Sequence, residues 1–147
     1  MIVSIKELQE DIFRKFTEKT NGGDFGIVNI EFPLITETLV VSLEHYRNQN
    51  TIYKFSFENI QSYMLIQENL PDEKKEGVLY SSDFKSIILK ELINSKYMEY
   101  LHSWTDLKIF FEGIALKKIR HYCVYAQNIL VNVITDQVPI IEIIEKD

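Results

Sequence analysis

Residues 118–135 gather several side chains that can do chemistry. A histidine, the only cysteine and two tyrosines lie within five positions of each other: His121, Tyr122, Cys123 and Tyr125. A thiol and an imidazole can form a nucleophile–base pair when they lie within hydrogen-bond reach. Positions 121 and 123 of a strand share one face, but their side chains are about 7 Å apart. A base for Cys123 would therefore come from elsewhere, such as His45; the alternative is a small buried cysteine in a sheet hairpin.

Glu112 is the carboxylate whose position best suits acid–base work. It interrupts the apolar run "FFEGIAL" and precedes a glycine. A glutamate lining a pocket there would have a raised pKa suited to proton transfer. The alternative is a carboxylate on the water-facing side of a strand.

The other candidates are aromatic or imidazole side chains. Tyrosine and tryptophan are common in binding hot spots, but they also suit half-buried strands. No spacing among His45, His102 and His121 indicates a zinc site. We therefore assign no catalytic, cofactor or metal residues, and we take as the candidate pocket or interface Glu112, His121, Tyr122, Cys123, Tyr125, His45 and Trp104.

The well-known catalytic motifs are absent from the sequence. The glycines of "NGGDFG" have neither the spacing nor the Lys-Ser/Thr ending of a phosphate-binding loop. No CxxC, HExxH or GxSxG occurs either. We expect no cofactor, and an enzyme is the less favoured class.

Composition limits the partners and the compartment. The 147 residues predict a single domain, 1–147, and the net charge is −6. That charge argues against nucleic acid as a main partner and suits a basic protein. The basic cluster around Lys118 and Arg120 is interpreted as a solvated strand edge. A single cysteine cannot form an intramolecular disulfide, which indicates a reducing cytoplasm. The absence of a run of about 18 apolar residues argues against a membrane partner.

Patterning predicts the elements that must position these residues. Ser4 and Glu7 form a capping box ahead of an apolar stripe that predicts a helix to residue 16. Alternation predicts strands over 26–33, 38–46 and 51–57, continuing to residue 69 after a break near Glu58 and Asn59. A charged loop follows at 68–77. Residues 81–104 predict a second helical region, which Asn94–Ser95 can divide, and further strands are expected over 105–116, 118–128, 129–135 and 139–144.

Runs of strands between helices predict an α+β fold. We expect a curved antiparallel sheet made of two meanders. The N-terminal helix and the central helical region would partly cover it.

Two segments, "FSFENIQSYMLIQEN" (Phe55 to Asn69) and "IRHYCVYAQNILVNVIT" (Ile119 to Thr135), resemble small α+β proteins of Gram-positive bacteria. Some of those proteins are immunity proteins of polymorphic toxin systems. The resemblance implies a cytoplasmic, non-enzymatic protein that binds and neutralises a toxin domain. It carries over no site residues, because no diagnostic motif accompanies it.

Three hypotheses follow. The first is a non-catalytic protein that binds a partner, such as a basic toxin domain, through an acidic and aromatic surface. The second is a small ligand-binding protein or acid–base enzyme with a pocket lined by carboxylates and tyrosines. The third is a homodimer formed by pairing of an exposed edge strand.

Overall fold

The structure is a computed structural model that describes residues 1–16, 24–67, 79–80, 88–93, 95–104, 118–127 and 129–147. For residues 67, 79, 80 and 104 it describes the backbone alone. The predicted loop at 68–77, the predicted strand at 105–116 and Glu112 lie outside these residues. No helix in the described part of the chain is long and apolar enough to span a membrane.

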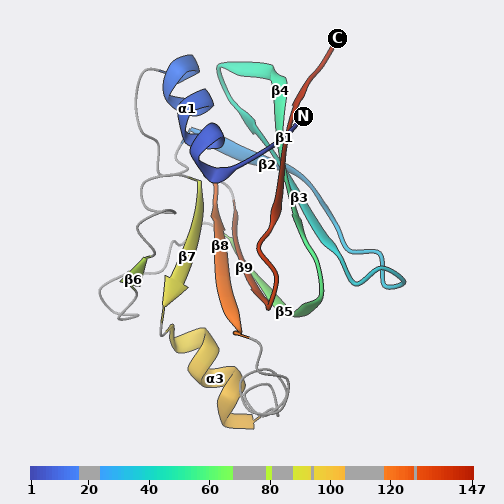
Figure 1. The fold of residues 1–147 in the computed structure, drawn as a ribbon, viewed down its shortest axis with the longest axis vertical. Coiled ribbons are helices and arrows are strands. Elements are labelled where there is room, and N and C mark those ends of the chain that lie inside the picture. Colours follow the sequence, from blue (N-terminus) through green and yellow to red (C-terminus); the bar gives the residue numbers. More distant parts are fainter. Residues whose placement is uncertain (17–23, 68–78, 81–87, 94, 105–117, 128) are drawn as a thin grey trace.

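The strands form two five-stranded antiparallel sheets (Figure 1). Sheet A has the order β1-β10-β4-β3-β2, with the bounds Ile2–Val3, Ile140–Glu145, Asn48–Phe57, Leu39–His45 and Phe25–Glu31. Sheet B has the order β5-β9-β8-β7-β6, with the bounds Ile60–Gln67, Ile129–Thr135, Arg120–Tyr125, Leu89–Ile93 and Leu79–Tyr80. The described helices are α1 (Ile5–Phe16) and α3 (Lys96–Trp104).

The predicted α+β class with antiparallel pairing is confirmed, but the chain forms two sheets where one was expected. Each run of strands gives one member to the other sheet. β5 follows β4 in the chain yet pairs with β9, and β10 follows β9 yet pairs with β4. The first crossing occurs at the predicted break, where Asn59 has φ of 50°. Asparagine tolerates this left-handed conformation better than most residues, so the chain can leave sheet A there.

The main core lies between the two sheets. The predicted apolar faces of β3 and β4 are buried, with Leu39, Val41, Leu43, Tyr53, Phe55 and Phe57 all at 0% exposure. They join one cluster with sheet B residues such as Tyr122, Val131 and Val133. Fully burying one such side chain contributes roughly 1.5–3 kcal/mol, so this face dominates the stability of the fold.

Helix α1 forms as its sequence predicts. The Ser4 N–H donates to Glu7 Oε2 at 2.6 Å, and the Glu7 N–H donates to Ser4 Oγ at 3.2 Å, which completes the capping box. Leu8 and Ile12 are buried in the main core. The helix therefore covers the upper end of the two sheets in Figure 1.

Part of the predicted central helical region is a strand. Residues 89–93 form β7, which pairs with β8 from Leu89↔Val124 to Leu92↔His121. This segment places Lys90 and Glu91 between Leu89 and Leu92, and that spacing of apolar residues suits a helix. In the strand both faces are buried, and the two charged residues are buried with them. Helix α3 begins only after the predicted break, and residues 81–87 lie outside the described residues.

A β-bulge changes the predicted face of β2. The register with β3 shifts between Ile27 and Asn29, which leaves Val28 exposed instead of aligned with Ile30. Ile27 packs against the core in its place. An inserted residue of this kind cannot be recognised from alternation alone.

Candidate functional site

His121 lies at the centre of a buried hydrogen-bond network on the outer face of sheet B. Its Nδ1 is 2.5 Å from Ser95 Oγ, and its Nε2 is 2.8 Å from Asn132 Oδ1. The Tyr97 ring of α3 packs edge-on against the imidazole, with the centroids 5.5 Å apart. Because Asn132 presents its oxygen, Nε2 carries the imidazole proton and Nδ1 accepts from the Ser95 hydroxyl.

This Ser–His–Asn chain of hydrogen bonds is similar to a hydrolytic relay, but the two ring nitrogens are exchanged: serine bonds Nδ1 and not Nε2. The surroundings also favour a structural role. Ser95 is 1% exposed, and its Oγ already accepts the Met98 N–H at 3.1 Å as the N-cap of α3. Burial lowers the pKa of His121 to about 4. An imidazole with so low a pKa is a weak base at neutral pH, so the network attaches α3 to sheet B.

The other residues of the 121–125 stretch divide between the two faces of β8. Cys123 and Tyr125 lie on the outer face in a small apolar cluster with Leu92 and Leu130. Lys90 lies 4.3 Å above the Tyr125 ring. Tyr122 points into the main core, where burial is the main cause that raises its pKa to about 12. The sequence placed His121 and these three residues in one candidate site. The structure keeps His121, Cys123 and Tyr125 on the outer face of β8 and places Tyr122 on the inner face.

The two remaining candidates with a described backbone lie elsewhere. His45 belongs to sheet A, where it stacks on Phe16 with the ring centroids 3.6 Å apart. Its Nδ1 accepts the Arg47 N–H at 3.1 Å, so it braces the β3–β4 turn and is not a base for Cys123. Trp104 is the last residue of α3, and its side chain is not among those described. Glu112 also stays untested.

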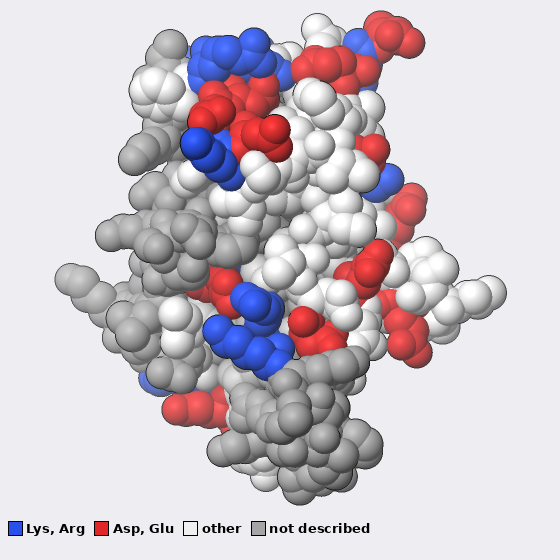
Figure 2. Space-filling view, viewed as in Figure 1, with Lys and Arg blue, Asp and Glu red and all other residues white. Residues whose placement is uncertain are grey.

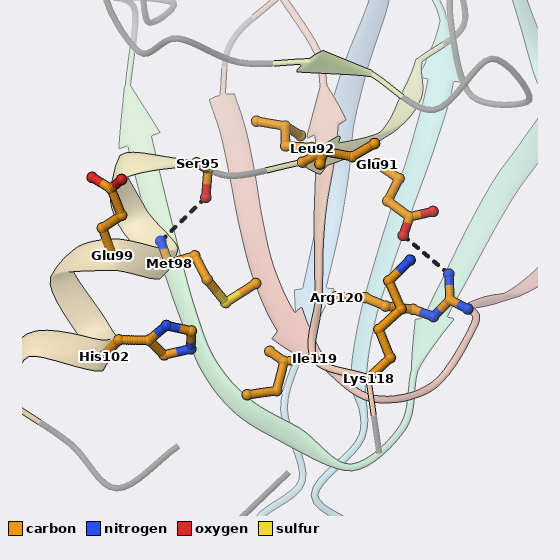
Figure 3. Close-up of a pocket in the computed structure, with 10 residues that line it drawn as sticks. Glu91, Leu92, Ser95, Met98, Glu99, His102, Lys118, Ile119 and Arg120 are labelled. Atoms are coloured by element: carbon orange, nitrogen blue, oxygen red, sulfur yellow. Dashed lines mark hydrogen bonds and ion pairs between the residues drawn. The ribbon is translucent and has the colours of Figure 1, made fainter. Parts of the chain in front are cut away.

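A cavity opens where β7 and β8 diverge and α3 begins (Figure 3). Its volume is about 350 Å³. Figure 3 shows Glu99 and His102 of α3 on one side, Glu91, Lys118 and Arg120 on the other, and Met98 and Ile119 between them. The sequence had singled out Lys118 and Arg120 only as a strand edge.

The polar groups that line this cavity differ in whether a described residue bonds to them. Arg120 is held by Glu91, with a guanidinium nitrogen 3.0 Å from Glu91 Oε1. The Nε2 atom of His102 is buried, and no described residue hydrogen-bonds to it. Lys118 and Glu99 are both exposed at the rim, and neither forms an ion pair within the described residues. Among the described residues, the cavity therefore has one charge of each sign that no ion pair neutralises.

A second feature is the tight turn between β2 and β3. Leu34 is 80% exposed and Ile35 is 98% exposed, yet the turn beneath them is well braced. The N–H groups of Thr36 and Glu37 both donate to Pro33 O, at 3.2 and 3.1 Å. Glu37 has φ of 52°, and its carbonyl oxygen accepts the Ile60 N–H at 3.2 Å. We call residues 33–37 the apolar tip.

Carboxylates and further apolar side chains surround the tip. The register places the end of β2, the start of β3, the end of β4 and the start of β10 side by side. The end of β2 and the connections beside it carry four acidic residues, Glu31, Glu37, Glu58 and Asp136. They also carry exposed Val138, and Phe32 links the tip to exposed Tyr63 of β5 with the ring centroids 5.4 Å apart. We call this surface the acidic end.

Basic side chains are absent from these segments. Residues 24–46 and 55–67 contain no lysine or arginine. Figure 2 shows the tip protruding on the right with acidic side chains beside it. Basic side chains gather over α1 at the top and in a second group at the lower centre of the view. The sequence contained a feature that could have identified the tip. The segment "PLI" places two apolar residues in a connection that is otherwise polar.

Among the described residues, no group of three or more histidine, cysteine, aspartate or glutamate side chains lies close enough to hold a metal ion. Comparison of the chain with protein-family models, curated proteins and solved structures finds no match.

Proposed function

We propose that this chain is a non-catalytic binding protein that uses its acidic end to hold a basic protein partner. The observation that carries the proposal is Ile35, a large apolar side chain that is 98% exposed on a hydrogen-bonded turn surrounded by carboxylates. An apolar centre with a polar rim is the usual anatomy of a protein interface.

Burial of the tip supplies the affinity. Leu34 and Ile35 each contribute roughly 1.5–3 kcal/mol when fully removed from water. The turn is held by two hydrogen bonds to Pro33 O and by Ile60 N–H, so little conformational freedom is lost on binding. Tyr63 and Leu65 on the edge strand β5 are 40% and 44% exposed, and they extend the apolar area beyond the tip.

The charge of the acidic end selects the class of partner. Phosphate groups of nucleic acid are bound mainly through lysine and arginine, which segments 24–46 and 55–67 lack. The same carboxylates repel an anionic lipid surface, although the tip is apolar. They also disfavour pairing of two acidic ends in a homodimer. A basic protein gains both the apolar contact and favourable steering.

The resemblance to immunity proteins supports a more specific role: the chain would neutralise a toxin in the cytoplasm. Immunity proteins act by tight stoichiometric binding and need no catalytic groups. The acidic end matches a nucleic-acid-degrading toxin in charge, because such an enzyme needs a basic surface for its own substrate.

Affinity capture with paired variants tests the proposal. We expect the wild-type chain to retain a basic protein from a lysate of the cell that makes it, and that protein, once purified, to bind directly. Ile35→Glu should weaken this binding at least tenfold because a charge replaces the buried contact.

Phe13→Glu is the matched control, because Phe13 is 56% exposed on α1 at the opposite end. Its affinity for the partner should equal that of the wild type. Equal capture by wild type and Ile35→Glu would refute the proposal, and so would tip-dependent retention of lipid vesicles or of a second copy of the chain.

A further inference from the structure

We propose that the cavity between α3 and the start of β8 binds a small zwitterion, a molecule with a carboxylate at one end and an amine at the other. This site is separate from the acidic end, and its occupancy does not depend on the proposed protein partner. The argument rests on the cavity and on the polar groups that line it (Figure 3).

The size of the cavity suits a small molecule. Ligand pockets usually have volumes of 300–1,000 Å³, and this one has about 350 Å³. A sphere of that volume is ~9 Å across, which accommodates a short aliphatic chain with a charged group at each end.

One side of the cavity favours a carboxylate. The Glu91 carboxylate fixes Arg120 at 3.0 Å and offsets its charge. Lys118 lies beside this pair in Figure 3 and forms no ion pair within the described residues, so the side as a whole carries one excess positive charge. Lysine is a mobile donor that suits a single carboxylate group.

The opposite side favours an amine. Glu99 on α3 forms no ion pair within the described residues, and His102 one turn further on turns its ring toward the cavity. The buried Nε2 of His102 finds no hydrogen bond there. An unsatisfied buried nitrogen costs free energy that a ligand group can recover.

The middle of the cavity is apolar. Met98 and Ile119 lie between the two charged sides. A ligand with only a charge at each end and methylene groups between them satisfies all three regions, whereas a simple anion or a simple amine leaves one rim charge without a partner.

The probes for the test are β-alanine, 5-aminopentanoate and 6-aminohexanoate, each titrated into the full chain while the NMR signals of the Met98 methyl group and the His102 ring are followed. We expect saturable shifts for at least one of the three at concentrations up to about 10 mM. Pentanoate and pentylamine, which each lack one charge, should bind at least tenfold more weakly.

Two variants assign the contacts. Lys118→Gln and Glu99→Gln should each weaken binding of the best probe about tenfold, since each removes one ion pair to the ligand. Lys6→Gln and Glu10→Gln are matched controls on the exposed face of α1 and should leave it unchanged. The inference is overturned if none of the three probes gives saturable shifts, or if the affinity is the same in Lys118→Gln and Glu99→Gln as in the wild type.

Discussion

His121 lies between two hydrogen-bonding side chains that come from different elements, Ser95 from the start of α3 and Asn132 from β9. Both ring nitrogens are satisfied while the imidazole is neutral. A proton on Nδ1 would have to displace the Ser95 hydroxyl hydrogen, in a site that burial has already made unfavourable for charge. His121 therefore uses its two ring nitrogens to hold α3 and β9 together, and not for catalysis.

The first prediction concerns the pH dependence of stability. The pKa of His121 is about 4 in the folded chain and near 6.5 when unfolded. The unfolded state therefore binds more protons below pH 6.5, so stability is complete above that pH and is lost as the pH falls toward 4. Between about pH 7.5 and 5.5, we expect the free energy of unfolding to fall by about 1.5 kcal/mol.

Urea unfolding of the wild type and of His121→Gln at the two pH values measures this effect. The glutamine variant should be less stable at both, but should lose less stability on acidification. Carboxylates stay ionised over this range, so they contribute little to the slope. An equal loss in the two proteins would show that His121 is not the group responsible.

The chemistry of residues 121–125 illustrates what the sequence could and could not predict at this scale. Strand geometry argued against a direct His121–Cys123 pair, and the ring nitrogens of His121 bind Ser95 and Asn132. The partners Ser95 and Asn132 come from 26 and 11 residues away, and only the folded chain brings them together. The burial of His102 Nε2, which no described residue hydrogen-bonds, likewise arises from the folded cavity and not from neighbours in sequence.

At the scale of elements, the exchange of strands between the sheets depends on the chain reversal at Asn59. Asn59 has φ of 50°, and its side-chain amide donates to Asp136 at 2.8 Å. The connection after β4 is thereby tied to the connection after β9. These are the two places where the chain crosses from one sheet to the other.

Substitution of Asn59 tests this role. Asn59→Ala should destabilise the fold by about 2 kcal/mol, because alanine is strained in the left-handed backbone conformation and cannot hydrogen-bond to Asp136. Asn59→Gly should lose only the hydrogen bond, and so about 1 kcal/mol. Chemical denaturation measures the free energy of unfolding of the two variants. An equal loss of stability in both would contradict a contribution from the backbone conformation of Asn59.

Elements with local determinants were predicted best. The capping box at Ser4–Glu7 sets the start of helix α1, and strict alternation predicts β3 and β4, so all three elements form as expected. Within the apolar stripe of α1, Phe13 is an exception and is 56% exposed. β7 was predicted as a helix because burial on both of its faces is imposed by the rest of the fold. The bulge at Val28 arises from pairing with β3, which the β2 sequence alone does not reveal.

At the scale of the whole molecule, charge and apolar exposure are unevenly distributed. Arg14 and Lys15 belong to α1 and Lys146 follows β10. Segments 24–46 and 55–67, which form most of the acidic end, contain no lysine or arginine. The net charge of −6 gave the sign of the expected partner. It could not locate the surface, because that location depends on β2, β3, β4 and β10 ending side by side.

Site-specific photocrosslinking in living cells tests the central proposal most directly. A photoreactive amino acid is placed at position 35 of the apolar tip or, as the control, at position 13 of α1; both side chains are more than half exposed. We predict one strong adduct with a basic protein from position 35 and none of that mass from position 13. The same adduct from both positions, adducts with lipid or with a second copy of the chain, or no adduct from position 35 would contradict binding of a basic protein at the acidic end.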